Sequence, residues 1–286
     1  MREPIVVGVD GSPVSLQAAE WAGREAALRG APVRVAHVAT EWAHHIPLVP
    51  EPGRWGEERA GALEELLQGA ANQVRAGRPD VQVTTEILEG GAGEALVAEA
   101  KGAQLLVVGN RGRGGFAELL LGSVSRYTAS RSPCPVVVVR GPHPHARGQI
   151  VAGVTGRADR SAVLDFAFRE AELRGAVLRV LHAWTHPTST GPGDMLPLVY
   201  DVEAVGQEEE ALLAQAVAGW REIRPDVELI QQVVRAHPAK ALIEASAEHD
   251  LTILGAHEGG RSLLGLGFVA HAVLHHARGP VVIVRP

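Results

Sequence analysis

The chain has 286 residues, of which 46% are hydrophobic, enough to bury the core of one large domain or of two ordinary ones. Its net charge is −6 and lysine and arginine form no run, which argues against a nucleic-acid-binding face. The single cysteine, Cys134, excludes a scaffold held by intrachain disulfides. No apolar run reaches the length of a transmembrane helix and the start lacks the pattern of a signal peptide, so we expect a cytoplasmic protein with no membrane partner.

In chain order, the first half alternates between apolar runs and segments with helical spacing. The apolar runs predict five strands, at 5–9, 33–38, 81–88, 105–108 and 136–139. The segments between them predict four helices, at 14–29, 61–76, 93–101 and 123–130. Alternation of this kind builds right-handed crossovers and a parallel sheet with helices on both faces.

The second half repeats the first. Residues 21–38 (WAGREAALRGAPVRVAHV) align without a gap with residues 166–183 (FAFREAELRGAVLRVLHA), and 11 of the 18 positions are identical. An offset of 145 to 146 residues also aligns the first, fourth and fifth apolar runs with their counterparts in the second half. The sequence therefore predicts two copies of a Rossmann-like, doubly wound, five-stranded parallel α/β domain, at 1–142 and 148–286, joined by a linker rich in proline and glycine.

The fifth strand of each copy would leave an open sheet edge in a domain that stood alone, and open edges invite aggregation. We therefore predict that Val136–Val139 and Val281–Val284 meet within one chain and form a pseudo-twofold pair. The sequence does not decide whether whole chains pair further into a homodimer.

A glycine motif follows the fourth strand of the first copy. It reads Gly109-x2-Gly112-x9-Gly122-Ser123, and its last two residues open the fourth helix. Glycine lacks the Cβ that would block an approaching phosphate, and the free amides and dipole of a helix N-terminus attract anions. Ser123 suits either of two roles, a cap of that helix or a hydroxyl donor to a phosphate. Ligands of doubly wound sheets bind outside the carboxyl ends of the strands, where the strand order reverses, so the loops after strands one and four should form the site.

This spacing, followed by Pro133-Cys134-Pro135 before the fifth strand, resembles the ATP-binding subclass of universal stress proteins. The resemblance covers both halves and includes the opening VGVDGS at 7–12 and the end of the second strand, His37-Val38. It implies that Asp10 and Val38 contact the adenosine end of ATP, and that Gly8 and Val108 line its pocket. The residues that it places around the ribose and the phosphates are Gly109, Asn110, Gly112, Gly122, Ser123 and Val124. The implied ligand is ATP together with Mg²⁺, and the implied setting is stress or dormancy physiology.

The second copy departs from the motif at four points. Glu258 stands at the position of Gly112, and Phe268 at that of Ser123. Thr155 replaces Asp10, and Arg157 replaces Ser12. A carboxylate and a phosphate at about 4 Å repel by about 4 kcal/mol at an effective dielectric near 20. These changes argue against ATP in the second copy, although they do not exclude another ligand there.

Several motif residues also have purely structural interpretations. The glycine loop could be only a tight strand-to-helix connection, and Asp10 could form an Asx turn before the helix start at Ser12-Pro13. Arg111 and Arg113 could reach phosphates or be solvated loop charges.

Other chemistry-bearing residues are better explained as structure. His271, His275 and His276 have a spacing that can hold a metal but fit an exposed helix face better. His37 and His182 recur at one repeat position and are expected to be buried, hydrogen-bonded strand-end histidines. Cys134 is expected to be a small buried residue rather than a redox thiol.

The segments 40–60 and 185–206 follow the second strand of each copy. They are long loops rich in histidine, tryptophan and proline, and long loops over a ligand crevice are often lids. We interpret the first as a lid, with a surface for an unknown protein partner as the alternative for either.

Three functions remain in competition. The first is a regulatory binding protein that holds ATP in the first copy with little or no turnover, because no nucleophile–base pair appears near the motif. The second is a slow ATPase or nucleotide-transferring enzyme on the same fold, although both the phosphate loop ending in Gly-Lys and the G-x-G-x-x-G fingerprint are missing. The third is an interaction protein that binds no nucleotide.

Overall fold

The computed structural model describes residues 2–39, 53–112, 120–141, 147–155, 161–185, 201–256 and 265–285, with the backbone alone at 53–59. The chain divides into two compact units, Met1–Pro142 with Gly260–Leu266, and His143–Gly259 with Gly267–Pro286. Most of the segment predicted as a lid, 40–60, and most of the segment 185–206 lie outside the described residues.

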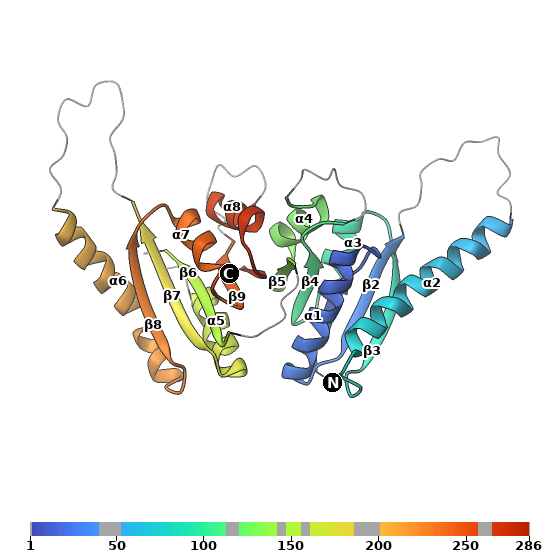
Figure 1. The fold of residues 1–286 in the computed structure, drawn as a ribbon, viewed down its shortest axis with the longest axis horizontal. Helices are drawn as coiled ribbons and strands as arrows, with labels where there is room; N and C mark the ends of the chain where they lie inside the picture. Colours follow the sequence, from blue (N-terminus) through green and yellow to red (C-terminus); the bar gives the residue numbers. More distant parts are fainter. Residues whose placement is uncertain are drawn as a thin grey trace, which may run out of the picture. The chain divides into compact units, whose positions relative to one another are not determined.

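The first unit is a five-stranded parallel sheet with helices on both faces (Figure 1). Its strands lie in the order β3-β2-β1-β4-β5, so the order reverses between β1 and β4. Their bounds are β1 Ile5–Gly8, β2 Val33–Ala39, β3 Val83–Glu89, β4 Leu105–Gly109 and β5 Val136–Val139. The helices are α1 Pro13–Arg29, α2 Gly53–Arg75, α3 Ala92–Glu99 and α4 Ser123–Arg131. Helices α1 and α2 pack on one face of the sheet, and α3 and α4 on the other.

The second unit repeats this arrangement, which confirms the predicted α/β fold in tandem copies. Its strands lie in the order β8-β7-β6-β9-β10. Their bounds are β6 Gln149–Val154, β7 Val177–Trp184, β8 Leu229–Arg235, β9 Leu251–Gly255 and β10 Val281–Val284. The helices are α5 Ser161–Arg174, α6 Val202–Ile223, α7 Pro238–Ala245 and α8 Phe268–His276. None of the described helices is long and apolar enough to cross a membrane.

Local signals in the sequence set the ends of α1. Ser12 is its N-cap and accepts a hydrogen bond from the Ser15 amide, and Pro13 occupies the first helical position. Gly30 ends the helix in the left-handed conformation, with φ of 57°, which glycine adopts without strain. The helix start predicted at Ser12-Pro13 is confirmed.

The core of each unit consists of its central strands. Every residue of β4 and β5 is buried, as expected for parallel strands covered on both faces. The outer strand β3 is mostly exposed and begins at Val83, two residues later than predicted. Val81 instead closes a turn, in which its amide donates to the carbonyl oxygen of Arg78.

The first two helices of the repeat pack differently in the two units. An ideal Cβ built on Gly23 of α1 would lie 2.3 Å from the carbonyl oxygen of Val74 on α2, so these helices touch through their backbones. The same repeat positions in the second unit are Phe168 and Trp220, whose rings stack with centroids 6.0 Å apart. Backbone contact in one copy is replaced by an aromatic pair in the other.

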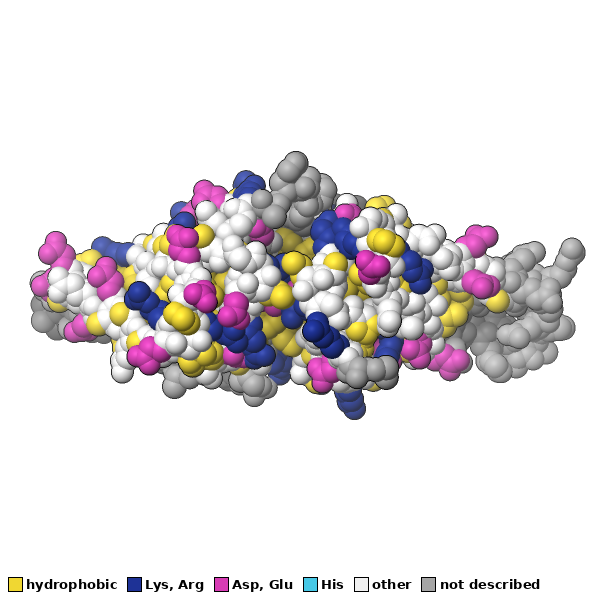
Figure 2. Space-filling view, turned by 90° about the horizontal axis from the view of Figure 1, so that it is seen from below, with side chains coloured by type: hydrophobic (Ala, Val, Ile, Leu, Met, Phe, Trp, Pro, Cys, Tyr) yellow, Lys and Arg dark blue, Asp and Glu magenta, His cyan; other side chains and the backbone are white. Residues whose placement is uncertain are grey.

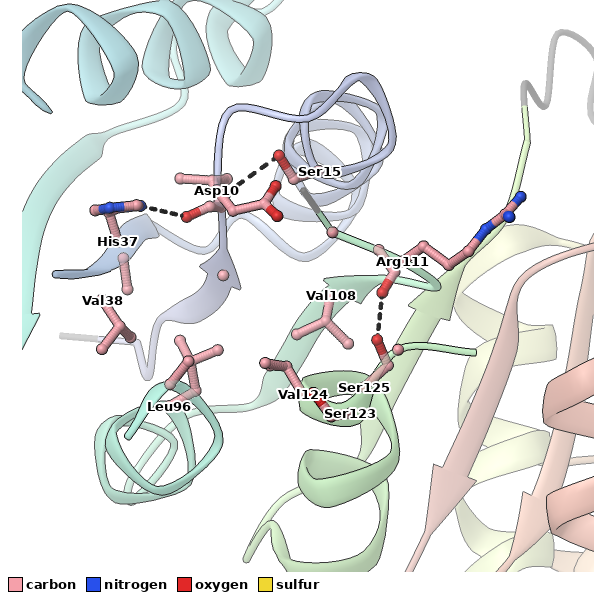
Figure 3. Close-up of a pocket in the computed structure, with 17 residues that line it drawn as sticks. Asp10, Ser15, His37, Val38, Leu96, Val108, Arg111, Ser123, Val124 and Ser125 are labelled. Atoms are coloured by element: carbon pink, nitrogen blue, oxygen red, sulfur yellow. Dashed lines mark hydrogen bonds between the residues drawn. The ribbon is translucent and has the colours of Figure 1, made fainter. Parts of the chain in front are cut away.

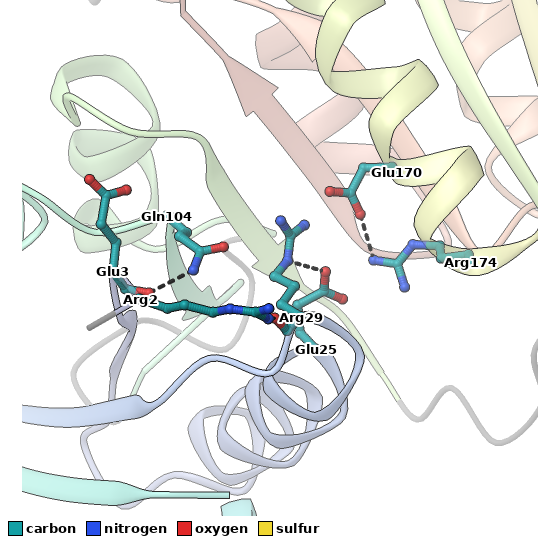
Figure 4. A network of polar contacts seen from close by, with 7 residues as sticks. All are labelled: Arg2, Glu3, Glu25, Arg29, Gln104, Glu170 and Arg174. Carbon is teal, nitrogen blue, oxygen red and sulfur yellow. Dashed lines mark hydrogen bonds and ion pairs between the residues drawn. The ribbon is translucent and has the colours of Figure 1, made fainter. Parts of the chain in front are cut away.

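One ion pair recurs near the end of this first helix (Figure 4). Arg29 Nε donates to Glu25 Oε1 at 2.7 Å in α1, and Arg174 Nη2 donates to Glu170 Oε2 at 2.9 Å in α5. Both glutamates are almost fully buried, so each carboxylate needs the charged partner that lies one helical turn away. Basic and acidic side chains are interspersed elsewhere on the surface that Figure 2 presents.

Candidate functional site

A pocket of about 420 Å³ opens at the carboxyl ends of β1, β2 and β4, where the strand order of the first unit reverses (Figure 3). This is the position at which doubly wound sheets bind ligands. Most of the residues named from the sequence line it, namely Gly8, Asp10, Val38, Val108, Gly109, Gly112, Gly122, Ser123 and Val124.

Asn110 is the named residue that does not line the pocket. It is buried, its side-chain amide donates to the Leu120 carbonyl at 3.3 Å, and its own carbonyl accepts from the Gly122 amide at 2.8 Å. It holds together the two ends of the glycine loop, which makes it a structural part of the site.

One end of the pocket is apolar. Val38 and Val108 lie around it together with Leu96 of α3, which the sequence motif did not indicate (Figure 3). A Cβ on Gly8 would lie 2.8 Å from Leu96 Cδ1, so glycine at position 8 lets this leucine reach the strand. The helical spacing of this segment predicted a helix but did not indicate that Leu96 lies at the site.

The other end of the pocket is the N-terminus of α4. Gly122 is the N-cap and provides no side-chain cap, while Ser123 is the first helical residue and is exposed. The alternative that Ser123 caps this helix is therefore wrong, because the cap position belongs to the residue before it. Ser125, which the motif did not include, is buried and donates its hydroxyl to the Gly109 carbonyl at 2.6 Å. This bond ties the first turn of α4 to the end of β4.

Asp10 lies between the first helix and the glycine loop. Its Oδ1 accepts a hydrogen bond from the Ser12 amide at 3.0 Å, which confirms the Asx turn. A Cβ on Gly112 would lie only 2.2 Å from Asp10 Oδ2, so any side chain at position 112 would displace this carboxylate.

Packing explains some motif glycines and not others. A Cβ on Gly109 would lie 2.9 Å from Val14 Cγ1 and 3.2 Å from its backbone, so α1 requires glycine there. A Cβ on Gly122 would approach no atom of the described residues closer than 3.5 Å, which is ordinary contact, and its φ of −75° suits any residue. Neither packing nor backbone conformation in the described part of the chain demands glycine at position 122.

The charged side chains at or near the pocket differ in the contacts that they form. His37 is half buried and its Nδ1 donates to the Val9 carbonyl at 2.8 Å, as expected for a hydrogen-bonded strand-end histidine. The Arg111 guanidinium is directed away from the apolar side chains (Figure 3), and Arg113 lies outside the described residues. Burial, and secondly the charge of Arg111, lower the pKa of Arg140 to about 10, and Arg140 donates to the Leu120 carbonyl at 3.2 Å.

The corresponding region of the second unit carries different side chains. Leu254 stands at the position of Val108, and a Cβ on Gly153 would lie 2.6 Å from Leu254 Cδ2 and 2.8 Å from Leu242 Cδ2. Phe268 begins α8 with 73% of its surface exposed, and Ala270 replaces Ser125. Glu258 and Arg157 lie outside the described residues.

Among the described residues, His182 and Cys134 have structural roles. His182 is buried and bonds both the Val154 carbonyl, at 3.1 Å, and Glu209 on α6, at 2.7 Å. The rings of His271 and His275 lie 4.4 Å apart on α8, but the described residues contain no group of three metal-ligating side chains. Cys134 is buried, and burial raises the pKa of its thiol, which disfavours the reactive thiolate.

Comparison with known sequences places both halves in one family. The model of the universal stress protein family matches residues 1–140 and 147–285. A universal stress protein of Mycobacterium tuberculosis is 36% identical over 292 residues, which cover 98% of this chain and 96% of the relative. One of Mycolicibacterium smegmatis is 35% identical over 289 residues, which cover 99% and 97% of the two chains.

A solved structure with a TM-score above 0.5 supports the fold. A universal stress protein from Archaeoglobus fulgidus superposes with a TM-score of 0.73 at 16% identity, and the match covers 99% of this chain and 96% of that one. A universal stress protein in complex with cAMP is 31% identical, covers 49% of this chain and has a TM-score of 0.39.

Proposed function

Because the chain belongs to the universal stress protein family, we propose that its first unit binds ATP as a regulatory ligand with little or no turnover. The adenosine occupies the apolar end of the pocket, between Val38 and Val108 over Gly8, with Asp10 at its side. The ribose and phosphates run along the loop from Gly109 to Gly112 toward the N-terminus of α4, at Gly122, Ser123 and Val124. The pocket volume of about 420 Å³ lies within the range of small-molecule sites.

Mg²⁺ would accompany the phosphates. Asp10 is the one carboxylate among the described residues that line the pocket. Mg²⁺ keeps several waters and commonly takes its remaining ligands from phosphates and one or two carboxylates. The side chains present suit a metal that arrives with the nucleotide better than a resident metal.

The observation that carries the proposal is Gly122. Packing within the described residues explains the glycines at 8, 109 and 112, but nothing there excludes a side chain at 122. A helix N-terminus with a bare N-cap beside a pocket presents free amides to an anion. A ligand in contact with this backbone would explain why position 122 is glycine.

The test is to place a side chain at position 122. We expect Gly122→Val to weaken ATP binding at least tenfold, about 1.4 kcal/mol, while the fold is kept. The measurement is calorimetric titration of ATP with Mg²⁺ into the full chain, and the matched control is Gly267→Val, the same position in the second unit. Equal ATP affinity in wild type and Gly122→Val would overturn the site, and loss of affinity in Gly267→Val would place binding in the other unit.

Low turnover is proposed because the titratable side chains of the pocket are engaged in structural bonds. Asp10 accepts from the Ser12 amide, and His37 donates to the Val9 carbonyl. Sustained, metal-dependent release of ADP that Gly122→Val abolishes would instead identify a slow ATPase. If millimolar ATP with Mg²⁺ leaves the melting temperature unchanged, the interaction protein without nucleotide is the correct function.

The biological part of the proposal rests on the family. The protein would act in the cytoplasm in the stress response, and nucleotide binding would change the surface shown to a protein partner. The second unit would bind no ATP, because Leu254 takes the position of Val108 and Phe268 that of Ser123.

A further inference from the structure

A second pocket of the first unit lies at the amino ends of β2 and β3, at the opposite end of the sheet from the nucleotide pocket. Its volume is about 640 Å³. Its apolar walls include Ala26 near the end of α1, Ala31 and Pro32 before β2, and Val81 before β3. Apolar walls with a few charged groups, in a volume of this size, are typical of sites for small molecules.

Two guanidinium groups and one carboxylate also line this pocket, those of Arg2, Arg78 and Asp80. Arg2 Nη1 donates to carbonyl oxygens at the end of α1, and Arg78 Nη1 donates to the Ala76 carbonyl at 2.6 Å. Each guanidinium uses one of its three nitrogens in these bonds, and neither forms an ion pair with a carboxylate of the described residues. Two positive charges against one negative charge favour an anion in the pocket.

The second unit shows what the equivalent arginine binds. Arg224 stands at the position of Arg78, and its Nη1 forms an ion pair with Glu172 Oε2 on α5. The first unit has Ala27 at the position of Glu172, and Ala27 lines the pocket together with Arg78. A methyl group therefore stands where the second unit carries the carboxylate that neutralises its arginine.

The backbone around the two arginines is equivalent, so the missing side chain leaves a defined space. The Val81 amide donates to the Arg78 carbonyl at 3.2 Å, and the Val227 amide donates to the Arg224 carbonyl at 3.3 Å. The glycine that ends the preceding repeat helix has a φ of 57° in both units. A glutamate side chain at position 27 would enter the pocket and reach the guanidinium.

The surroundings of Arg78 do not supply this carboxylate from elsewhere. Burial lowers the pKa of Arg78, the charge of Arg24 acts in the same direction, and the charge of Glu20 opposes both. Glu20 Oε1, however, is bound by Arg24 Nη1 at 2.5 Å, so this acid already neutralises another arginine. The partly buried Arg78 guanidinium would gain a direct ion-pair partner from a ligand.

We propose that this pocket binds a small organic acid, whose carboxylate takes the place at Arg78 that Glu172 fills at the equivalent arginine of the second unit. Arg2 adds a second positive charge, which outweighs the negative charge of Asp80. The apolar walls contact the body of the acid. This site is separate from the nucleotide pocket and stands or falls independently of ATP binding.

The test is a titration of the full, nucleotide-free chain with butyrate at constant ionic strength, followed by NMR. We expect the Arg78 Nε–Hε signal and the Val81 methyl signals to shift along one saturable curve. Butyramide has nearly the same shape without the charge and should shift neither signal. The Arg224 signal is the internal control, because Glu172 already holds that guanidinium.

An exchange of side chains between the two units gives matched variants. Ala27→Glu supplies the missing carboxylate and should abolish the saturable shift. Arg78→Gln, followed at the Val81 methyl signals, serves the same purpose if Ala27→Glu does not fold. The reverse exchange, Glu172→Ala, should make the Arg224 signal respond to butyrate as Arg78 does in the wild type.

Three results would overturn the proposal. A shift at Arg78 that is linear in butyrate, or equally large with butyramide, would mean that the pocket has no site for a carboxylate. A saturable shift that persists in Ala27→Glu would place the acid outside this space. An Arg224 signal that stays unresponsive in Glu172→Ala would mean that loss of the glutamate does not create a site.

Discussion

Residues in contact have changed together between the two copies. Gly112 leaves room for the Asp10 carboxylate, and the second copy has Glu258 and Thr155 at these positions. A glutamate at position 112 would collide with Asp10 and repel it, so a smaller, uncharged residue at position 10 removes both problems. Gly93, whose Cβ would lie 2.7 Å from the Tyr127 ring, shows the same pattern, with Ala239 and Ala272 in the second copy.

Ser125 is the residue that we expect to position the phosphate-binding amides. Removing its hydrogen bond to the Gly109 carbonyl frees the first turn of α4 from the end of β4. A net hydrogen bond contributes about 1 kcal/mol, so Ser125→Ala should weaken ATP binding about fivefold. Calorimetry on the full chain measures this, with Ala270→Ser in the second unit as the control. An affinity equal to that of wild type would show that α4 keeps its place without this bond.

At the scale of elements, helix packing supplies a matched pair of glycine substitutions. Gly23→Ala forces a Cβ against the Val74 backbone and should destabilise the first unit by about 1–3 kcal/mol. Gly69→Ala on α2 meets nothing within 4 Å and should stabilise it by up to about 1 kcal/mol through helix propensity. Denaturant unfolding of both variants gives the two free energies. Stabilisation of the first unit by Gly23→Ala would show that the contact at Gly23 is relaxed in solution.

The elements were more predictable than the contacts within the site. Apolar runs and glycine or proline breaks indicated each strand and helix, because burial on both faces of a parallel sheet leaves a continuous signal. The motif spacing also indicated which loops meet at the carboxyl ends of β1 and β4. It could not indicate Leu96 or Ser125, because their roles depend on distances across the sheet, to Gly8 and to the Gly109 carbonyl. The motif spacing also could not distinguish Gly109, which packing requires to be glycine, from Gly122, which packing within the described residues does not.

At the scale of the whole molecule, the pairing of the two copies through their fifth strands stays a prediction from the sequence. In a strand paired on one side only, about half of the amides have no partner and exchange quickly with solvent. We expect hydrogen exchange of the full chain to show protection throughout Val136–Val139 and Val281–Val284. The outer strands β3 and β8 are the comparison, being at least partly exposed at the other end of each sheet. Fast exchange of alternate amides in β5 and β10 would contradict the pairing.

The backbone contact at Gly23 and the ring stack of Phe168 on Trp220 have a consequence for how the chain reaches its native state. Tandem copies with similar sequences risk exchanging segments while they fold, one copy capturing a helix of the other. A first helix carrying Phe168 cannot approach α2 closely, and one carrying Gly23 would leave Trp220 facing a void. Either hybrid loses packing, so we expect each helix to pair with the second helix of its own half, which would limit misassembly of the duplicated domain.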